Sequence, residues 1–312
     1  MPERCLNLCE LNVALRLGGE EGESAGVNGV VHLRQWLGAV CAEAGWSGFE
    51  RLYLGSSFCG NAFLHNTGGA PMTALQQLSQ IYDVPCTLVV PTPLERELRP
   101  VKCRVEYLLD AFSCIDEVTV NDYGMLAWLA GQGRIAVNVG RLFSKDLRDL
   151  RYHDGFPEVY RPALSGRALD DLCARYPRLR GIEYDPCGYV LDLTEVPVSL
   201  TAAVHVPYLF ATTGAFCPYA PSTASGSPAS AGAPCCQECN EAMTTYRLKG
   251  ATGDLVDEEG LPQAKGRPLY YTKHGRTVFV LNEGMAVRSR APYRMVYTPR
   301  HFGWLAGEEA AQ

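Results

Sequence analysis

Residues 86–121 have the sequence CTLVVPTPLERELRPVKCRVEYLLDAFSCIDEVTVN. The stretch begins with an apolar run at Cys86–Pro91, has a helical pattern at Val105–Phe112, and ends with a second apolar run at Glu117–Asn121. Strands that are nearly continuous in apolar residues and alternate with helices are typical of parallel βαβ units, in which both faces of the sheet are covered. This stretch therefore predicts an α/β fold.

The same alternation extends through the first two thirds of the chain. Further strands are predicted at Glu10–Leu17, Phe49–Gly55, Ile135–Gly140, Gly181–Tyr184 and Val198–Val204, and further helices at Val31–Ala44, Met72–Tyr82, Tyr123–Ala130 and Ala168–Tyr176. Repeats of this kind fit a (β/α) barrel, complete or incomplete, better than an open sheet. No GxGxxG motif follows the first strand, which argues against a dinucleotide-binding fold.

The composition narrows the classes of function. The chain has 312 residues, of which 47% are hydrophobic and 20% are charged, and it carries a net charge of -6. No basic run indicates nucleic-acid binding, no apolar stretch is long enough to span a bilayer, and the N-terminus lacks a signal-peptide pattern. We therefore expect a cytoplasmic protein. Thirteen cysteines in a reducing compartment predict buried thiols and a subset that binds metal, in place of a disulfide framework.

The C-terminal third of the chain differs in amino-acid composition from the rest. Residues Pro218–Pro234 are rich in Pro, Ser, Ala and Gly, which predicts a loop. The segments Pro268–Lys273 and Thr277–Leu281 flank His274 and Gly275, which predicts a hairpin. The sequence thus suggests a barrel over residues 1–216, an extension packed on the barrel mouth over residues 217–306, and a frayed tail over Gly307–Gln312.

Four cysteines are the leading candidates for a functional site: Cys59, Cys217, Cys235 and Cys239. In a (β/α) barrel, chemistry takes place at the C-terminal ends of the strands, and Cys59 directly follows a predicted strand. Thiolates gathered from distant segments suit a tetrahedral metal site or an iron–sulfur cluster. The alternative is that Cys59 and Cys217 are buried apolar residues and that Cys235 and Cys239 belong to a small zinc site.

The motifs resemble those of the collagenase-like peptidase family, and within it the UbiU/UbiV-type iron–sulfur branch. The resemblance is carried by LYLGSSFC, by a single cysteine followed by a Cys-x-x-x-Cys pair, and by VTVNDYGML, RIAVNVGRL, RGIEYD and TVFVLNEGM, which together cover most of residues 50–285. It implies a partial (β/α) barrel and a [4Fe–4S] cluster with Cys59, Cys217, Cys235 and Cys239 as ligands, beside a spare Cys236. It also implies a role in oxygen-independent hydroxylation, together with a paralogous partner subunit.

The chain departs from the family at a few positions. Phe216 stands where the family commonly has Arg, and the segment after Asn138 is less rich in Asn than in close members. These differences leave the cluster motif intact and concern the substrate, which we expect to be a small oxygenated or aromatic molecule bound in the barrel mouth.

Several polar residues near strand ends are candidates for catalysis. Glu183 and Asp185 could act as acid and base or form structural ion pairs. His205, just beyond a predicted strand, could donate a proton or be a hydrogen-bonded core histidine. Asn121, with Asp122 beside it, could contact substrate or bond the backbone in a turn.

Two further features have a functional and a structural interpretation. Arg141 could pair with a carboxylate or phosphate, although a surface position is the ordinary expectation. Cys5 and Cys9 have the Cys-x-x-x-Cys spacing, but no other ligands lie near them in the sequence, and we interpret them as structural thiols.

Three classes of function follow. The first, which we favour, is an iron–sulfur component of a hydroxylation or related modification reaction. The second is a non-catalytic, cluster-bearing partner subunit, and the third is a zinc-stabilised barrel hydrolase or peptidase. The chain has no GxSxG, HExxH or Cys–His nucleophile signature, so the sequence gives peptidase activity little support.

Overall fold

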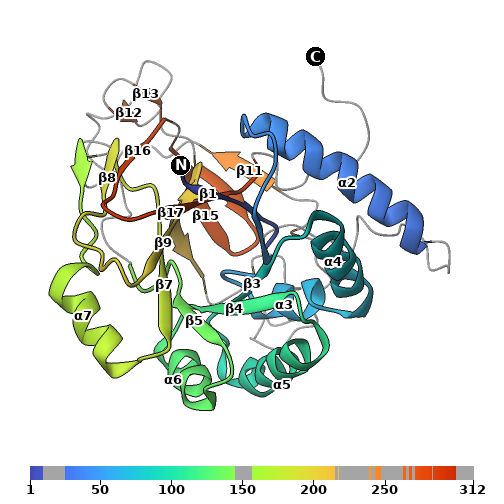
Figure 1. Ribbon diagram of the computed structural model, residues 1–312. Helices are drawn as coiled ribbons and strands as arrows, with labels where there is room; N and C mark the ends of the chain where they lie inside the picture. The colour runs from blue at the N-terminus through green and yellow to red at the C-terminus, as the bar shows by residue number, and fades with distance from the viewer. Residues whose placement is uncertain are drawn as a thin grey trace, which may run out of the picture.

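The structure is a computed structural model, and it describes residues 1–9, 25–144, 157–214, 217, 239, 243–246, 263–264, 267–268, 271–282 and 284–299. Its central feature is a closed barrel of eight parallel strands in the order β1-β17-β9-β7-β5-β4-β3-β2 (Figure 1). The strands are β1 (Glu3–Asn7), β2 (Arg51–Gly55), β3 (Cys86–Val90), β4 (Ile115–Val120), β5 (Ala136–Val139), β7 (Leu179–Tyr184), β9 (Thr201–Val206) and β17 (Tyr293–Tyr297). The predicted (β/α) barrel is confirmed, and it is complete.

Helices cover the outside of the barrel (Figure 1). They are α2 (Ala25–Glu43), α3 (Gly60–Asn66), α4 (Gly69–Tyr82), α5 (Glu95–Ala111), α6 (Tyr123–Gln132) and α7 (Gly166–Arg175). Apolar side chains of these helices and the outward-facing residues of the strands form the main hydrophobic core. Within the described part of the chain, no helix combines the length and the apolar character needed to cross a membrane.

The barrel is closed by a strand from near the end of the described chain. β17 pairs with β1 on one side and with β9 on the other, so residues 293–297 belong to the barrel and not to the extension that the sequence suggested. The sequence criterion missed β17 because its inward position, Arg294, interrupts the apolar run. Arg294 bonds Glu3 on β1 and Glu117 on β4, which makes this strand part of a buried charge network.

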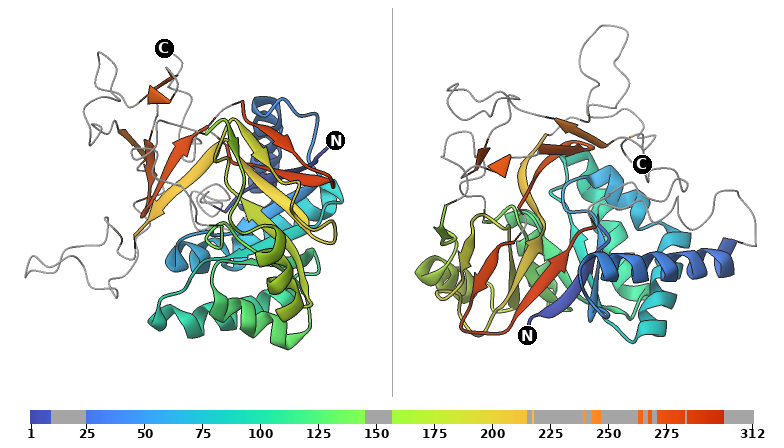
Figure 2. Two further views of the ribbon diagram at one scale, coloured as in Figure 1. Left: turned by 90° about the vertical axis from the view of Figure 1, so that its left-hand side faces the viewer. Right: turned by 90° about the horizontal axis from the view of Figure 1, so that it is seen from above.

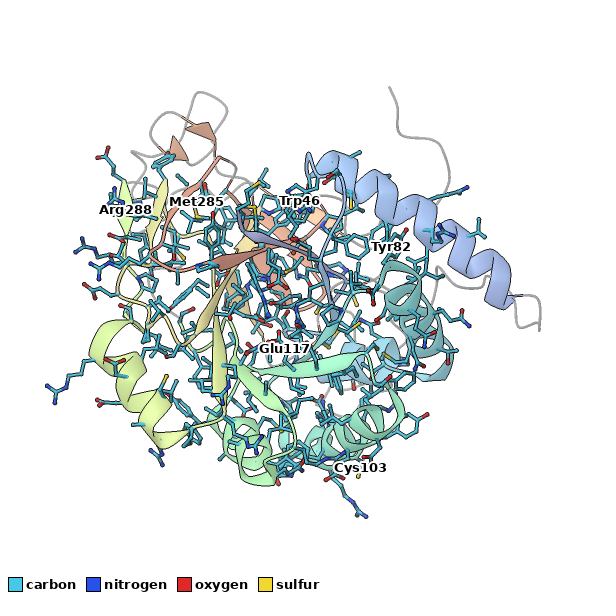
Figure 3. All side chains as sticks on the ribbon, viewed as in Figure 1. Trp46, Tyr82, Cys103, Glu117, Met285 and Arg288 are labelled. Atoms are coloured by element: carbon cyan, nitrogen blue, oxygen red, sulfur yellow. The ribbon has the colours of Figure 1, made fainter. Side chains whose placement is uncertain are left out.

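That network lies at the N-terminal end of the barrel. Arg51 also forms ion pairs with Glu3 and with Asp116. The residues Arg51, Glu117 and Arg294 are all buried. In Figure 3 Glu117 lies inside the ring of barrel strands. Removing one partner of such a buried ion pair commonly costs about 3–5 kcal/mol, because the other charge is left without compensation.

A second sheet lies at the other end of the barrel. Its strands β10 (Tyr208–Thr213), β15 (Thr277–Leu281), β14 (Tyr271–His274) and β11 (Met243–Tyr246) are antiparallel in that order, and the predicted hairpin around Gly275 is confirmed. β10 begins directly after the end of β9, which places this sheet at the C-terminal mouth, and Figure 2 shows it extending away from the barrel. The remaining strands are β6 (Val159–Tyr160), β8 (Val190–Asp192) and β16 (Ala286–Arg288) in one sheet, and β12 (Gln263–Ala264) paired with β13 (Arg267–Pro268).

Some predicted boundaries move and others are outside the described residues. The strand Glu10–Leu17, the loop Pro218–Pro234 and the tail Gly307–Gln312 lie outside them, and the first barrel strand is β1. β9 starts later than the predicted Val198–Val204 and runs to Val206, so His205 is inside the strand and not beyond it. α5 begins at Glu95, well before Val105, and the Glu97 side chain caps its first turn by accepting a hydrogen bond from the Leu94 amide (3.0 Å).

Gly55 at the end of β2 allows the close approach of β3. Its φ of 111° is unfavourable for other residues, and a Cβ there would lie 2.3 Å from the Val89 carbonyl oxygen. We expect Gly55→Ala to lower the free energy of unfolding by more than about 1 kcal/mol. Urea unfolding would measure the change. Gly131→Ala in α6 is the matched control, because apart from its chain neighbours and the backbone of its own helix nothing lies within 4 Å of its Cβ position, and it should be neutral or stabilising. Equal stability of the two variants would contradict the close approach.

Candidate functional site

Two of the predicted candidates meet inside the barrel. Glu183 on β7 accepts a hydrogen bond from Thr119 Oγ1 on β4 (2.7 Å), and its other oxygen lies 2.9 Å from His205 Nε2 on β9. Glu183 and His205 are each 1% exposed. Their positions follow from the strand period of two, since Ile182 and Tyr184 pack outward in the main core and the residue between them faces inward.

His205 is held in its neutral form. Burial lowers the pKa of His205 below its ordinary value, and the Arg141 guanidinium lowers it further, against the opposing effect of the Glu183 carboxylate. A neutral imidazole that donates from Nε2 to Glu183 carries a lone pair on Nδ1, and Nδ1 has no hydrogen-bond partner in the described part of the chain. The pair therefore presents a base nitrogen inside the barrel.

Tyr53 and Asn138 extend this polar centre, and sequence reasoning missed both. The Tyr53 ring on β2 meets the His205 ring edge to face, with 6.0 Å between their centroids. The Tyr53 hydroxyl and Asn138 Oδ1 are buried and have no hydrogen-bond partner among the residues described. In a strand every second side chain faces the barrel interior, and Tyr53 and Asn138 occupy such positions. Which positions face inward becomes known only with the register of the barrel strands.

Asn121 is not part of this centre. Its side-chain amide donates to the Val90 carbonyl (3.1 Å) and accepts from the Leu142 amide (3.3 Å), so it joins the ends of neighbouring strands. Asp122 caps α6 by accepting a hydrogen bond from the Met125 amide (2.9 Å). Both residues thus have the backbone roles that are usual at a strand end.

Arg141 and Asp185 form a buried ion pair at the C-terminal mouth. Asp185 Oδ1 accepts from Arg141 Nε (2.7 Å) and Nη2, and both side chains are 1% exposed. The expectation of a surface Arg141 is therefore wrong, because the carboxylate and the Tyr208 carbonyl (2.8 Å) satisfy the guanidinium in the interior. The guanidinium also lies over the rings of Phe58 and Phe279, at 5.5 and 5.9 Å from their centroids.

The turn between β14 and β15 lies beside the segments that carry three of the candidate cysteines. Arg276 donates to the Phe58 carbonyl, next to Cys59, from Nε (2.9 Å) and from Nη2. The Arg276 carbonyl accepts from the Gly214 amide (2.9 Å), three residues before Cys217. Gly275 faces Cys239, and a Cβ on this glycine would lie 3.7 Å from Cys239 Sγ. Cys59, Cys217 and Cys239 are all half-buried, and none is in a disulfide.

The described residues do not complete a metal site by themselves. Among them, no group of three or more His, Cys, Asp or Glu side chains is arranged to hold a metal ion. Cys235 and Cys236 lie outside the described residues. His274, beside Cys239, has its pKa lowered to about 4 by burial, partly offset by a hydrogen bond with the Cys239 backbone.

Cys5 and Cys9 are buried at 0% and 1% exposure in a small core inside the barrel. Burial raises the pKa of the Cys5 thiol well above its ordinary value, with the Glu3 carboxylate acting in the same direction. A thiol in this state is a small apolar side chain, in agreement with the structural interpretation.

In comparisons with known proteins, no family model, no curated protein and no solved structure matches this chain. The resemblance to the iron–sulfur branch of the collagenase-like peptidases thus stays a prediction from the motifs.

The burial of neutral His205 predicts a pH dependence of stability. Because the pKa of His205 is lower in the folded chain than in the unfolded one, the unfolded chain binds the proton more readily. The stabilising contribution is present above about pH 6.5 and is lost as the pH falls towards the folded-state pKa. We expect His205→Gln, which does not titrate, to lose less stability than the wild type between pH 7 and pH 5, as measured by urea unfolding at each pH. Identical slopes in the two proteins would contradict a buried neutral His205.

Proposed function

We propose that the protein is an iron–sulfur protein with a [4Fe–4S] cluster at the C-terminal mouth of the barrel, and that it acts in an oxygen-independent hydroxylation or related modification reaction. The proposed ligands are Cys59, Cys217, Cys235 and Cys239. The proposal combines the resemblance of the motifs with one structural observation. The β14–β15 turn gathers the segments that carry Cys59, Cys217 and Cys239 from three distant parts of the sequence.

The chemistry of these side chains fits such a group. Cysteine thiolates are the usual ligands of iron–sulfur clusters, and Arg276 supplies a positive charge close to Cys59. A cluster held by four protein thiolates would supply electron transfer. In this proposal Arg276 fixes the loop of Cys59 through the Phe58 carbonyl, and Gly275, with a φ of 57°, forms the turn that lies beside Cys239.

The polar centre below the mouth is the proposed source of acid–base chemistry. Glu183 orients the imidazole through Nε2, and Nδ1 of His205 is the atom that would accept a proton from a bound molecule. The substrate class that we propose is a small oxygenated or aromatic molecule in the mouth. Activity would also depend on a paralogous partner subunit, as the resemblance implies.

The second candidate is a non-catalytic, cluster-bearing subunit. It is favoured by the almost complete burial of Glu183 and His205, which leaves their base nitrogen without contact to solvent. The two candidates differ in one test. If the protein is catalytic, Glu183→Gln and His205→Gln should lower turnover of the assembled complex and leave the visible absorption of the cluster unchanged. If neither substitution changes turnover, the non-catalytic subunit is favoured.

The ligand assignment can be tested by anaerobic purification and iron analysis. The wild type should be brown, with about four irons per chain. Cys59→Ala, Cys217→Ala, Cys235→Ala and Cys239→Ala should each lose most of the iron and the visible absorption, because each removes one thiolate ligand.

Cys103→Ala is the matched control, because Cys103 is exposed on α5, at the periphery of the molecule (Figure 3). Cys86→Ala and Cys173→Ala should likewise keep their iron. A colourless, zinc-loaded wild type would favour the zinc-stabilised hydrolase. Loss of iron in Cys236→Ala with retention in Cys235→Ala would show that the spacing is assigned wrongly.

The role of the turn gives a separate prediction. Arg276→Met keeps much of the side-chain length but removes both donors to the Phe58 carbonyl, and hydrogen bonds of a charged donor contribute about 1.5–3 kcal/mol. We expect this variant to lose iron faster on exposure to air than the wild type, as followed by the decay of visible absorption. Arg288→Met on β16 is the control. An unchanged decay in Arg276→Met would contradict the role of the turn.

A further inference from the structure

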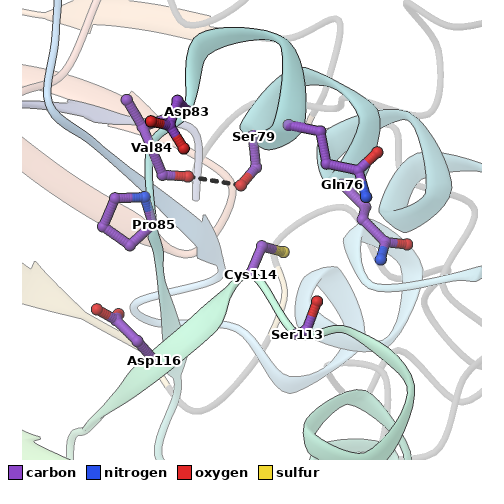
Figure 4. A pocket seen from close by; sticks show the side chains of 9 residues that line it. Gln76, Ser79, Asp83, Val84, Pro85, Ser113, Cys114 and Asp116 are labelled. Carbon is purple, nitrogen blue, oxygen red and sulfur yellow. Dashed lines mark hydrogen bonds between the residues drawn. The ribbon is translucent and has the colours of Figure 1, made fainter.

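A pocket of about 350 Å³ lies at the N-terminal end of the barrel strands, opposite the end where Cys59 follows β2. Its lining comes from the end of α4 and from the segments that lead into β3 and β4, and it consists of Gln76, Ser79, Gln80, Asp83, Val84, Pro85, Ser113, Cys114 and Asp116. In Figure 4 the thiol of Cys114 lies among polar side chains, with Ser79 and Ser113 on either side. Neither the cluster nor the Glu183–His205 pair uses this pocket.

A second thiol lies directly behind Cys114. Cys86 opens β3 and Cys114 precedes β4, and the Cys86 amide donates to the Cys114 carbonyl (2.8 Å). Their side chains also lie close enough to influence each other's pKa. Cys86 is 0% exposed, whereas Cys114 is half-buried and lines the pocket. Cys114 is thus open to small molecules from solvent, whereas Cys86 is closed to them.

The surroundings make Cys114 the more acidic thiol of the two. The neighbouring Cys86 side chain lowers the pKa of Cys114 below its ordinary value, and burial opposes this effect. The same interaction between the two thiols, together with burial, raises the pKa of Cys86. Asp116, also in the pocket, opposes the thiolate, but Arg51 binds this carboxylate through two hydrogen bonds (2.6 and 2.9 Å) and offsets its charge.

We propose that Cys114 and Cys86 are a redox-active thiol pair that small hydroperoxides oxidise to a disulfide through this pocket. The thiolate of Cys114 attacks the terminal peroxide oxygen, the O–O bond breaks, and a sulfenic acid forms while the leaving hydroxide takes up a proton as water. The sulfur of Cys86 then attacks the Cys114 sulfur, the S–O bond breaks, the S–S bond forms, and a second water leaves. Two thiols and one hydrogen peroxide give one disulfide and two waters.

The exposed Cys103 on α5 provides an internal standard for reactivity. A thiol at the surface is fully accessible, so a thiol that reacts faster must owe its rate to a larger thiolate fraction. We therefore expect iodoacetamide to modify Cys114 of the full chain faster than Cys103 at pH 7, as measured by peptide mass spectrometry.

The pairing is tested by treating the full chain with a small excess of hydrogen peroxide, blocking the remaining thiols and mapping the peptides. The wild type should give a disulfide between the peptides of Cys86 and Cys114. Cys86→Ser should accumulate sulfenic acid at Cys114, trapped by a cyclic 1,3-diketone, and Cys114→Ser should leave Cys86 unoxidised. Cys103→Ser should form the Cys86–Cys114 disulfide as the wild type does.

Alkylation of Cys103 before Cys114, or a disulfide that joins Cys114 to any other cysteine, would overturn the proposal. The rate comparison uses the wild type alone, so it stays decisive even if a variant fails to fold. Iron content separates this site from the proposed cluster. Cys86→Ser and Cys114→Ser should retain iron, whereas Cys59→Ala should lose it and still form the Cys86–Cys114 disulfide.

Discussion

The closure of the barrel by β17 is the constraint on which the other features depend. This strand joins β1 to β9, and it leaves no barrel strand with an unpaired edge. The contact is reinforced by charges, because Arg294 on β17 bonds the buried Glu117 and the half-buried Glu3. Closure of the barrel fixes the register of every strand, and the register decides which side chains point inward. The polar centre around His205 and the orientation of the mouth therefore both follow from closure.

The barrel interior is divided into ends with different chemistry. The N-terminal end holds a network of paired charges, and the middle holds Glu183 and His205 beside a small apolar core with Cys5. At the C-terminal mouth the Arg141–Asp185 pair connects the strands to the aromatic rings of the second sheet. Buried polar groups are costly unless they are paired, and the Tyr53 hydroxyl and Asn138 Oδ1 have no hydrogen-bond partner among the described residues.

Two groups of cysteines lie at opposite ends of the same barrel. Of the candidate ligands that the structure describes, Cys59 and Cys217 follow strand ends and Cys239 lies beside the β14–β15 turn, whereas Cys86 and Cys114 lie where β3 and β4 begin. Separation along the strands allows one fold to hold thiols of different character. Those at the mouth suit a soft metal centre, and the pair at the pocket has one accessible and one buried sulfur.

The sequence by itself determined the class of fold, because apolar runs such as Cys86–Pro91 and the helical patterns between them are local consequences of burial on both faces of a parallel sheet. It also identified Glu183, His205 and the cysteines by chemical type. It could not reveal β17 or the partners of Arg141, since Arg294 and Arg141 look like surface residues until strands distant in sequence enclose them. Only the tertiary structure decided that Glu183 meets His205 while Asn121 bonds the backbone, because register and closure are properties of the whole barrel and not of any segment.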